Sequence, residues 1–308
     1  MEITLPTKPL EHFDDPNGLI SLCTLSAVNW GKIKNPKQFE KVCKLAVYAL
    51  DALLDYQDYP LQAARNSTEW YRPLGIGIND LAHFLAKKGL KYDADALGVV
   101  DEYMEAMAFY LTKASVELAK KYGACGKAEH TRYSDGVVPC DVRKVGVDSL
   151  IEHKERMDWD GLRNDLKVYG IRNATLMAAM PSETSSRVQN LTNGIEPVRD
   201  LIAVKDGISI VAPEAEKLKS KYVSAWDVDV EDYLKVVAVL QKWIDQSIST
   251  NTTYDPSRFP EGKIPGNLVL RHLLLGYKWG VKTFYYNNNV KQDTVVDKQE
   301  ESCDSCVL

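Results

Sequence analysis

Two cysteines lie near the end of the chain, in the sequence Cys303-Asp304-Ser305-Cys306. Two thiols at this spacing can form a disulfide, and a mobile polar tail would let them reach distant partners at high effective concentration. The alternatives are an inert tail or half of a zinc site. Zinc needs four ligands, however, and the sequence contains no second pair of closely spaced cysteines. Prenylation is excluded because it requires a cysteine at the fourth position from the end, and that residue is Ser305.

A hydroxyl-rich segment follows a predicted strand. Its residues are Pro181, Ser182, Glu183, Thr184, Ser185 and Ser186. Hydroxyls and backbone N–H groups gathered at a strand-to-helix turn can bind an anion without help from lysine or arginine. The alternative is an ordinary capped turn.

Tyr285 and Tyr286 stand together at the end of a short predicted strand. Neighbouring strand residues point to opposite faces, so a functional stacked pair would require a local departure from regular strand geometry. The alternative is that both rings belong to the core or its rim. Cys23, taken alone, is typical of a small buried apolar residue.

Composition narrows the class of protein. The 308 residues carry a net charge of -5, and 45% of them are hydrophobic, which is enough for a sizeable core. The negative net charge argues against a general nucleic-acid or membrane-surface binder, because such a protein would need a basic face. No apolar run approaches membrane-spanning length and the start is unlike a secretory signal, so we expect a cytoplasmic protein. The six cysteines and five histidines show no zinc-ligand spacing, and we expect no metal site in this chain.

Helical periodicity alternates with short apolar runs. The spacing of apolar residues predicts helices over residues 36–54, 81–88, 95–122, 159–169, 230–247 and 265–279. Strands or extended segments are predicted at 74–78, 174–180, 248–254 and 281–286, with a hairpin at 201–211 around Asp206-Gly207. Asn79 and Asp80 are in place to cap the helix that begins at Leu81. This order indicates an α/β fold with helices outside and strands inside.

The order of several short motifs along one chain is more specific than any of them alone. These motifs are Glu2-Ile3-Thr4-Leu5-Pro6, Leu22-Cys23-Thr24-Leu25-Ser26, Arg72-Pro73-Leu74-Gly75-Ile76-Gly77-Ile78, the 181–186 segment with Asn193-Gly194-Ile195-Glu196-Pro197, Tyr285-Tyr286 and the terminal cysteine pair. As an ordered set they resemble the large, catalytic (alpha) subunit of class I ribonucleotide reductase. The resemblance covers essentially the whole chain.

The resemblance implies a fold and a division of the chain. Residues 1–287 would form the helix-rich second half of a ten-stranded α/β barrel, and residues 288–308 a flexible redox-active tail. In that family a finger loop carries an Asn-x-Cys-x-Glu motif, and Glu2 matches its glutamate. The radical cysteine and the asparagine would then lie upstream of Met1. We therefore expect a split large subunit that is active only with a separate amino-terminal half.

Catalytic roles follow from the same resemblance. Glu2 resembles the general base that takes the proton of the ribose 3′-hydroxyl. Cys23 resembles one member of the active-site dithiol that reduces the 2′ position. Tyr285 and Tyr286 resemble the stacked tyrosines that pass the radical from the small subunit to the thiol.

Binding roles complete the expectation. Ser182, Glu183, Thr184, Ser185 and Ser186, with Pro181 before them, resemble the loop that holds the substrate diphosphate. Cys303 and Cys306 resemble the shuttle that re-reduces the active-site disulfide, with thioredoxin or glutaredoxin as its reductant. The helix at 265–279 falls where the family binds the carboxy-terminal tail of the small subunit. No cofactor is expected in this chain, since the dinuclear metal and tyrosyl radical belong to the small subunit.

The expected activity is that of a ribonucleoside-diphosphate reductase, an oxidoreductase that converts ribonucleotides to 2′-deoxyribonucleotides by thiyl-radical chemistry. Two alternatives come from other classes. One is a non-catalytic remnant that binds the small subunit, and the other is a thiol-disulfide or metal-binding module that rests on the tail cysteines alone. The retention of Glu2, Cys23, the tyrosine pair and the tail cysteines together weighs against the remnant, and a metal assay with a redox titration of the tail cysteines would distinguish the module.

Overall fold

The computed structural model describes residues 5–205 and 208–289. The predictions made for Glu2, Cys303 and Cys306, and for the Asp206-Gly207 turn, lie outside the described residues. The helices are α1 (Phe39–Tyr56), α2 (Gln62–Tyr71), α3 (Leu81–Lys88), α4 (Leu97–Tyr122), α5 (Trp159–Tyr169), α6 (Glu183–Val188), α7 (Ala215–Leu218), α8 (Val230–Gln241) and α9 (Gly266–Trp279). The strands are β1 (Leu25–Asn29), β2 (Gly75–Asn79), β3 (Ile202–Lys205), β4 (Ile208–Val211), β5 (Thr250–Tyr254) and β6 (Phe284–Asn289).

Parallel strand pairs are joined into one array by an extended segment at residues 175–179. β1 pairs with β2 and β5 pairs with β6, both in parallel register. The N–H groups of Leu74 and Ile76 donate to the carbonyls of Thr175 and Leu176 on one side of that segment. On its other side Ala179 forms a parallel bridge with Ile248. The order is therefore β1, β2, 175–179, β5, β6, which confirms an α/β fold.

A closed barrel is not formed by the residues that the structure describes. The array has two ends, at β1 and at β6, and the remaining pair, β3 with β4, is a separate antiparallel hairpin. The ten-stranded barrel therefore stays a prediction, as does the division at residue 287. β6 runs to Asn289, two residues past that division.

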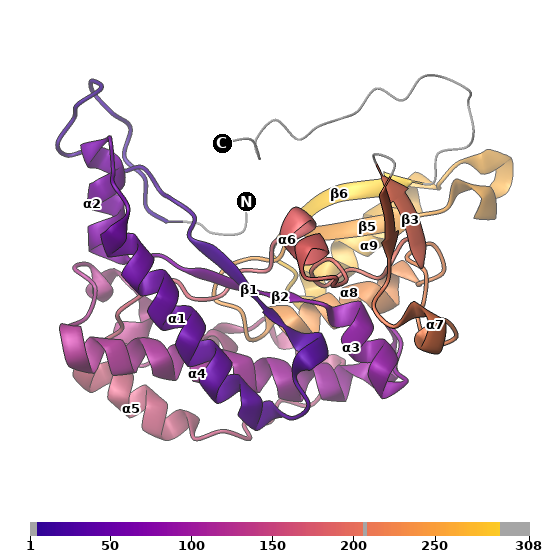
Figure 1. The fold of residues 1–308 in the computed structure, drawn as a ribbon, viewed down its shortest axis with the longest axis horizontal. Coiled ribbons are helices and arrows are strands. Elements are labelled where there is room, and N and C mark those ends of the chain that lie inside the picture. Colours follow the sequence, from indigo (N-terminus) through magenta and orange to yellow (C-terminus); the bar gives the residue numbers. More distant parts are fainter. Residues whose placement is uncertain (1–4, 206–207, 290–308) are drawn as a thin grey trace.

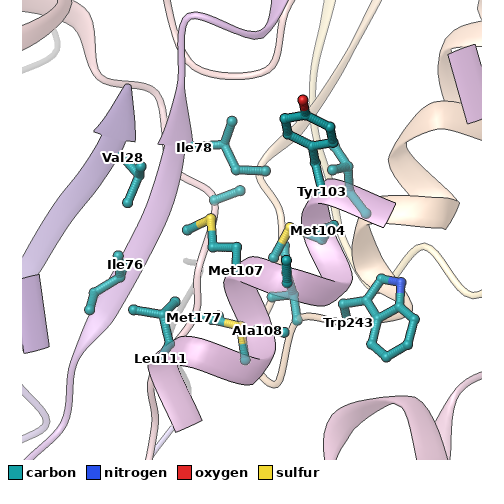
Figure 2. Close-up of a cluster of buried hydrophobic side chains, with 14 of the residues drawn as sticks. Val28, Ile76, Ile78, Tyr103, Met104, Met107, Ala108, Leu111, Met177 and Trp243 are labelled. Atoms are coloured by element: carbon teal, nitrogen blue, oxygen red, sulfur yellow. The ribbon is translucent and has the colours of Figure 1, made fainter. Parts of the chain in front are cut away.

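The core lies between the strands and the long helix α4. Figure 1 shows α1, α4 and α5 together along one side of β1 and β2. Figure 2 shows Val28 of β1 and Ile78 of β2 facing Met107 of α4. Every position of the seam predicted for the long helix is buried, namely Leu97, Val100, Met104, Met107, Leu111, Ala114 and Leu118.

Two helical predictions differ from the structure. The helix expected over 230–247 ends as α8 at Gln241, because the chain must turn there to reach β5. α2 was not predicted, because its sequence is polar and half of its buried residues are the polar Asn66, Ser67 and Thr68. Among the described residues, no helix combines the length and the apolar character that crossing a membrane would need.

α9 is fastened to β5 by an uncharged histidine. The hydroxyl of Tyr254 lies 2.9 Å from Nδ1 of His272, and the two rings stack at 5.7 Å. His272 is only 5% exposed, and burial lowers its pKa from the usual 6.5 because a charged imidazole loses its hydration there.

Acid is therefore expected to destabilise the α9 contact. Because the folded-state pKa of His272 is depressed, the neutral ring contributes stability above the unfolded value of 6.5, and this is lost as pH falls through the folded value. The unfolding midpoint in urea should drop on acidification, and His272→Phe, which stacks but cannot titrate, should flatten that drop. Equal acid slopes for the two proteins would contradict this.

Candidate functional site

Cys23 lies at the start of the array, just before β1. The N–H of Gly75 donates to the carbonyl of Thr24, so pairing with β2 extends back beside this cysteine. Val28 points into the core, and by alternation Leu25 and Cys23 face the opposite side. The side chain of Cys23 is exposed. The sequence-based reading of an isolated Cys23 as a buried apolar residue is therefore wrong.

The face of β2 that is turned away from Ile76 and Ile78 is also buried and needs a glycine. A Cβ on Gly77 would lie 2.6 Å from the carbonyl oxygen of Ala178 and 2.9 Å from Sδ of Met180. No other residue allows this approach without a shift of the chain. Gly77 thus lets the segment that leads into Pro181 lie tightly against β2.

The 181–186 segment, predicted as a polar strand-to-helix turn, is itself largely helical in the structure. From Glu183 onward it forms the short helix α6, and Glu183 has a positive φ of 36°. The hydroxyls of Ser185 and Ser186 donate to carbonyls one turn earlier, those of Ser182 and Glu183. Within the described part of the chain, Oγ of Ser182 is buried without a hydrogen-bond partner.

The side chain of Asn193 is hydrogen-bonded to the backbone amides near the start of this segment. Its Oδ1 accepts the N–H of Ser182 at 2.7 Å and the N–H of Glu183 at 3.0 Å. Its Nδ2 donates to Oε1 of Glu183 at 2.8 Å. The backbone donors that an anion would use at these two residues are therefore already bound to a side chain.

Asn193 is itself held by buried groups at the end of β2. Asp80 is fully buried, and its Oδ1 accepts the N–H of Thr192 at 2.8 Å. Oδ1 of Asn79 accepts the N–H of Gly194 at 2.9 Å. The prediction that these side chains cap α3 is wrong: Asp80 makes no capping hydrogen bond, has a φ of 69°, and anchors the 192–194 segment instead.

The other oxygen of Asp80 engages a histidine. Nδ1 of His83 lies 2.8 Å from Oδ2 of Asp80, and Nε2 lies 3.0 Å from Oε2 of Glu214. Burial opposes charging of the ring, but the hydrogen bonds to Asp80 and Glu214 outweigh it and raise the pKa of His83. Sequence reasoning missed this cluster, because Asp80, Thr192 and Glu214 come together only in the fold.

Tyr285 and Tyr286 form a close aromatic pair on β6. Their ring centroids are 4.2 Å apart with an interplanar angle of 54°. The two side chains are 50% and 52% exposed, so neither ring is part of the core. The departure from strand geometry that such a pair requires is present, since the register between β5 and β6 shifts between Thr250 and Thr252.

The predicted site residues within the described ranges come from three members of the array. Cys23 precedes the first strand, the 181–186 segment follows the third member, and the tyrosine pair lies on the last strand. The catalytic and binding roles of these residues stay predictions.

One group of possible metal ligands lies elsewhere among the described residues. Oε1 of Glu155 is 3.9 Å from Sγ of Cys140 and 3.7 Å from Nε2 of His153. Both oxygens of Glu155 are bound by Arg163, however, and burial raises the pKa of the Cys140 thiol to about 12. A protonated thiol and a carboxylate engaged by a guanidinium are poor ligands, so we assign no metal to this cluster.

A cavity of about 640 Å³ opens at the amino ends of the strands. Its lining includes residues that come shortly before β2, the 175–179 segment, β5 and β6, namely Tyr71, Ala174, Asp245 and Val281. Leu5 also lines it. It lies at the opposite end of the array from α6.

Comparison with known proteins identifies the family of this chain. The family model of the ribonucleotide reductase barrel domain matches residues 1–212 and 207–287, and the chain belongs to this family. It is 49% identical over 312 residues to the ribonucleoside-diphosphate reductase subunit alpha of Haemophilus influenzae, covering 99% of this chain and 41% of that protein. The resemblance found in the sequence motifs is therefore confirmed.

Other relatives are similar over the same extent. Identity is 48% to ribonucleoside-diphosphate reductase 1 subunit alpha of Escherichia coli K12, over 99% of this chain and 42% of that protein. It is 37% to the subunit alpha of Enterobacteria phage T4, over 100% of this chain and 42% of that protein. The chain thus spans about two-fifths of the length of the curated relatives that it matches.

Proposed function

We propose that this chain is the part of a ribonucleoside-diphosphate reductase large subunit that receives the radical and holds the substrate diphosphate. The observation that carries the proposal is the tyrosine pair, with rings 4.2 Å apart and half exposed, in a chain 48% identical to an alpha subunit. Phenols suit radical transfer because their one-electron oxidation is coupled to loss of the O–H proton. Tyr285 and Tyr286 would carry the radical from a small subunit, whose dinuclear metal and tyrosyl radical start the chemistry.

Thiol chemistry would complete the turnover. The exposed side chain of Cys23 would supply one reducing equivalent and end in a disulfide with a cysteine of the remaining part of the large subunit. Cys303 and Cys306 would then exchange with that disulfide and be reduced in turn by thioredoxin or glutaredoxin. Glu2 would act as the general base at the ribose 3′-hydroxyl.

The diphosphate would bind at the 181–186 segment. Because Oδ1 of Asn193 already accepts the N–H groups of Ser182 and Glu183, binding at those amides requires that the Asn193 side chain be displaced. The buried, unpartnered Oγ of Ser182 is a further donor within the described part of this segment.

A separate amino-terminal part of the large subunit is the main proposed partner. Relatives that match this chain are more than twice as long. β1 is paired with β2 on one edge, and α1, which packs on β1, exposes apolar side chains. Val42 is 37% exposed, Leu45 67% and Leu53 48%, which is typical of a surface that a partner covers.

Reconstitution tests this function. The chain would be mixed with the remaining amino-terminal part of the large subunit, a radical-bearing small subunit, a thioredoxin system and a ribonucleoside diphosphate. We expect 2′-deoxynucleotide formation that depends on every component. Folded parts that bind one another and never turn over would refute the proposal and favour the non-catalytic remnant instead.

α9 is the proposed docking surface for the carboxy-terminal tail of the small subunit. Leu270 is 56% exposed and Leu274 59%, one turn apart on the helix, and Tyr277 nearby is 67% exposed. Leu274→Asp should weaken small-subunit binding by roughly tenfold or more, because a charge would stand in an apolar contact. Val168→Asp, at a 71% exposed position of α5, is the matched control, and calorimetric titration measures both. Equal affinities would count against this surface.

A further inference from the structure

β6 contains one residue more than its partner strand can match. Thr250 pairs with Phe284 and Thr252 pairs with Asn287, so two steps along β5 correspond to three along β6. An extra residue of this kind is a β-bulge, which removes a ladder hydrogen bond and redirects side chains. Here it falls on Tyr285 and Tyr286.

The bulge explains how two successive residues lie together. Phe284 is directed at α9, where a Cβ on Gly276 would overlap its ring. Alternation sends Tyr285 to the other side, and a regular strand would return Tyr286 to the α9 side. The observed ring separation of 4.2 Å shows that Tyr286 instead stays beside Tyr285.

Asn251 lies opposite the bulge, between the two paired threonines. Its Oδ1 accepts the N–H of Tyr286 at 3.0 Å. A bulge leaves a backbone donor without its ladder acceptor, and a buried donor without a partner is costly. The Asn251 side chain, only 8% exposed, supplies that acceptor.

A second contact fixes which way the Asn251 amide points. Its Nδ2 donates to Oε1 of Glu196 at 2.5 Å. Burial raises the pKa of Glu196, and the hydrogen bond from Asn251 opposes this by favouring the ionised form, which only accepts hydrogen bonds. The backbone N–H of Tyr286 can only donate, so the carbonyl oxygen of the amide faces Tyr286 and the NH₂ group faces Glu196. Glu196 belongs to the 193–197 segment, whose Asn193 holds the start of α6. The same segment therefore contacts the predicted diphosphate site and β5, the strand that pairs with the strand of the tyrosines.

We propose that Asn251, oriented by Glu196, is the positioning residue that sets the bulge and thereby keeps Tyr285 and Tyr286 in contact. The radical-transfer consequence rests on the proposed function, whereas the geometric part does not. The hydrogen bond between Asn251 and Tyr286 is made by the backbone N–H of the tyrosine, so Asn251 acts on the tyrosines through chain geometry.

Hydrogen exchange of the Tyr286 amide tests the geometry without turnover. In Asn251→Ala the amide loses its acceptor and should exchange roughly tenfold faster, as expected for one lost hydrogen bond. Thr253→Ala, two residues after Asn251 on β5, is the matched control and should leave the exchange rate of the Tyr286 amide unchanged. Unchanged protection of Tyr286 in Asn251→Ala would overturn the proposal.

A paired substitution separates positioning from a general loss of packing. Asn251→Asp alone keeps an acceptor for Tyr286 but sets two carboxyl groups against each other, so protection should fall. Adding Glu196→Gln reverses donor and acceptor between the two side chains and should restore protection. Failure of the double variant to recover over Asn251→Asp would overturn the proposal even where Asn251→Ala does not fold.

The reconstituted enzyme supplies the functional readout. Asn251→Ala should lower kcat with little change in KM for the nucleoside diphosphate, and Asn251→Asp with Glu196→Gln should recover kcat. An unchanged kcat in Asn251→Ala, with exchange of Tyr286 accelerated, would overturn the link to radical transfer. If the unsubstituted chain never supports turnover, the proposed function fails, while the exchange measurement still decides the role of Asn251.

Discussion

Tyr285→Phe or Tyr286→Phe is expected to reduce nucleotide reduction by the reconstituted enzyme at least ~10³-fold, which corresponds to roughly 4 kcal/mol of activation free energy. Phenylalanine retains the ring that packs in the 4.2 Å pair but has no phenol to oxidise at an accessible potential. Both side chains are half exposed and lie outside the core, so the folded state should tolerate the change. Deoxynucleotide formation under saturating small subunit measures the effect.

The control for this experiment is another exposed tyrosine. Tyr169, at the end of α5, is 45% exposed, and Tyr169→Phe should leave turnover unchanged. Urea unfolding curves of all three variants should agree within about 0.5 kcal/mol, as is usual for surface substitutions. Turnover that survives in Tyr285→Phe or Tyr286→Phe would remove the tyrosine pair from the proposed mechanism.

The long elements could be predicted because their information is local. The limits of α3 and α5 were predicted correctly at residues 81–88 and 159–169, and the seam of α4 is buried as its apolar spacing indicated. An amphipathic helix shows its buried face in its own sequence. The extended segment 175–179 was located by its apolar run, but its place in the array depends on backbone hydrogen bonds to β2 and β5.

The anchors of the site could not be predicted, because they depend on contacts between distant residues. Asp80 looks like a helix cap from its neighbours alone, and only the fold brings Thr192 to it. Asn251 sits in a polar strand sequence, and nothing local to it indicates Glu196 or Tyr286. The tyrosine pair did give one usable signal: two adjacent functional side chains on a strand require a bulge, and the bulge is present.

We expect a buried ion pair to stabilise the contact between α4 and the chain that follows α8. Nζ of Lys242 lies 2.6 Å from Oδ1 of Asp101, and both side chains are fully buried. The ammonium makes no hydrogen bond of regular geometry among the described residues, so its contact with Asp101 is chiefly electrostatic. The same oxygen accepts the indole N–H of Trp243 at 2.8 Å. α4 is thereby tied to the chain that turns from α8 toward β5.

Asp101→Asn is expected to lower the free energy of unfolding by about 3–5 kcal/mol, because it leaves the Lys242 ammonium buried without its counter-charge. Glu102→Gln makes the same chemical change at the next, exposed position of α4 and should cost little. Adding Lys242→Met to Asp101→Asn removes the stranded charge and should recover part of the loss. Urea unfolding at neutral pH measures all three. Similar stabilities for Asp101→Asn and Glu102→Gln would mean that the pair does not hold α8 against α4. In that case the turn that leads to β5, and with it the position of Asn251 beside the tyrosines, must be maintained by other contacts. Among these are the hydrogen bonds that Lys282 donates to the carbonyls of residues 244–246.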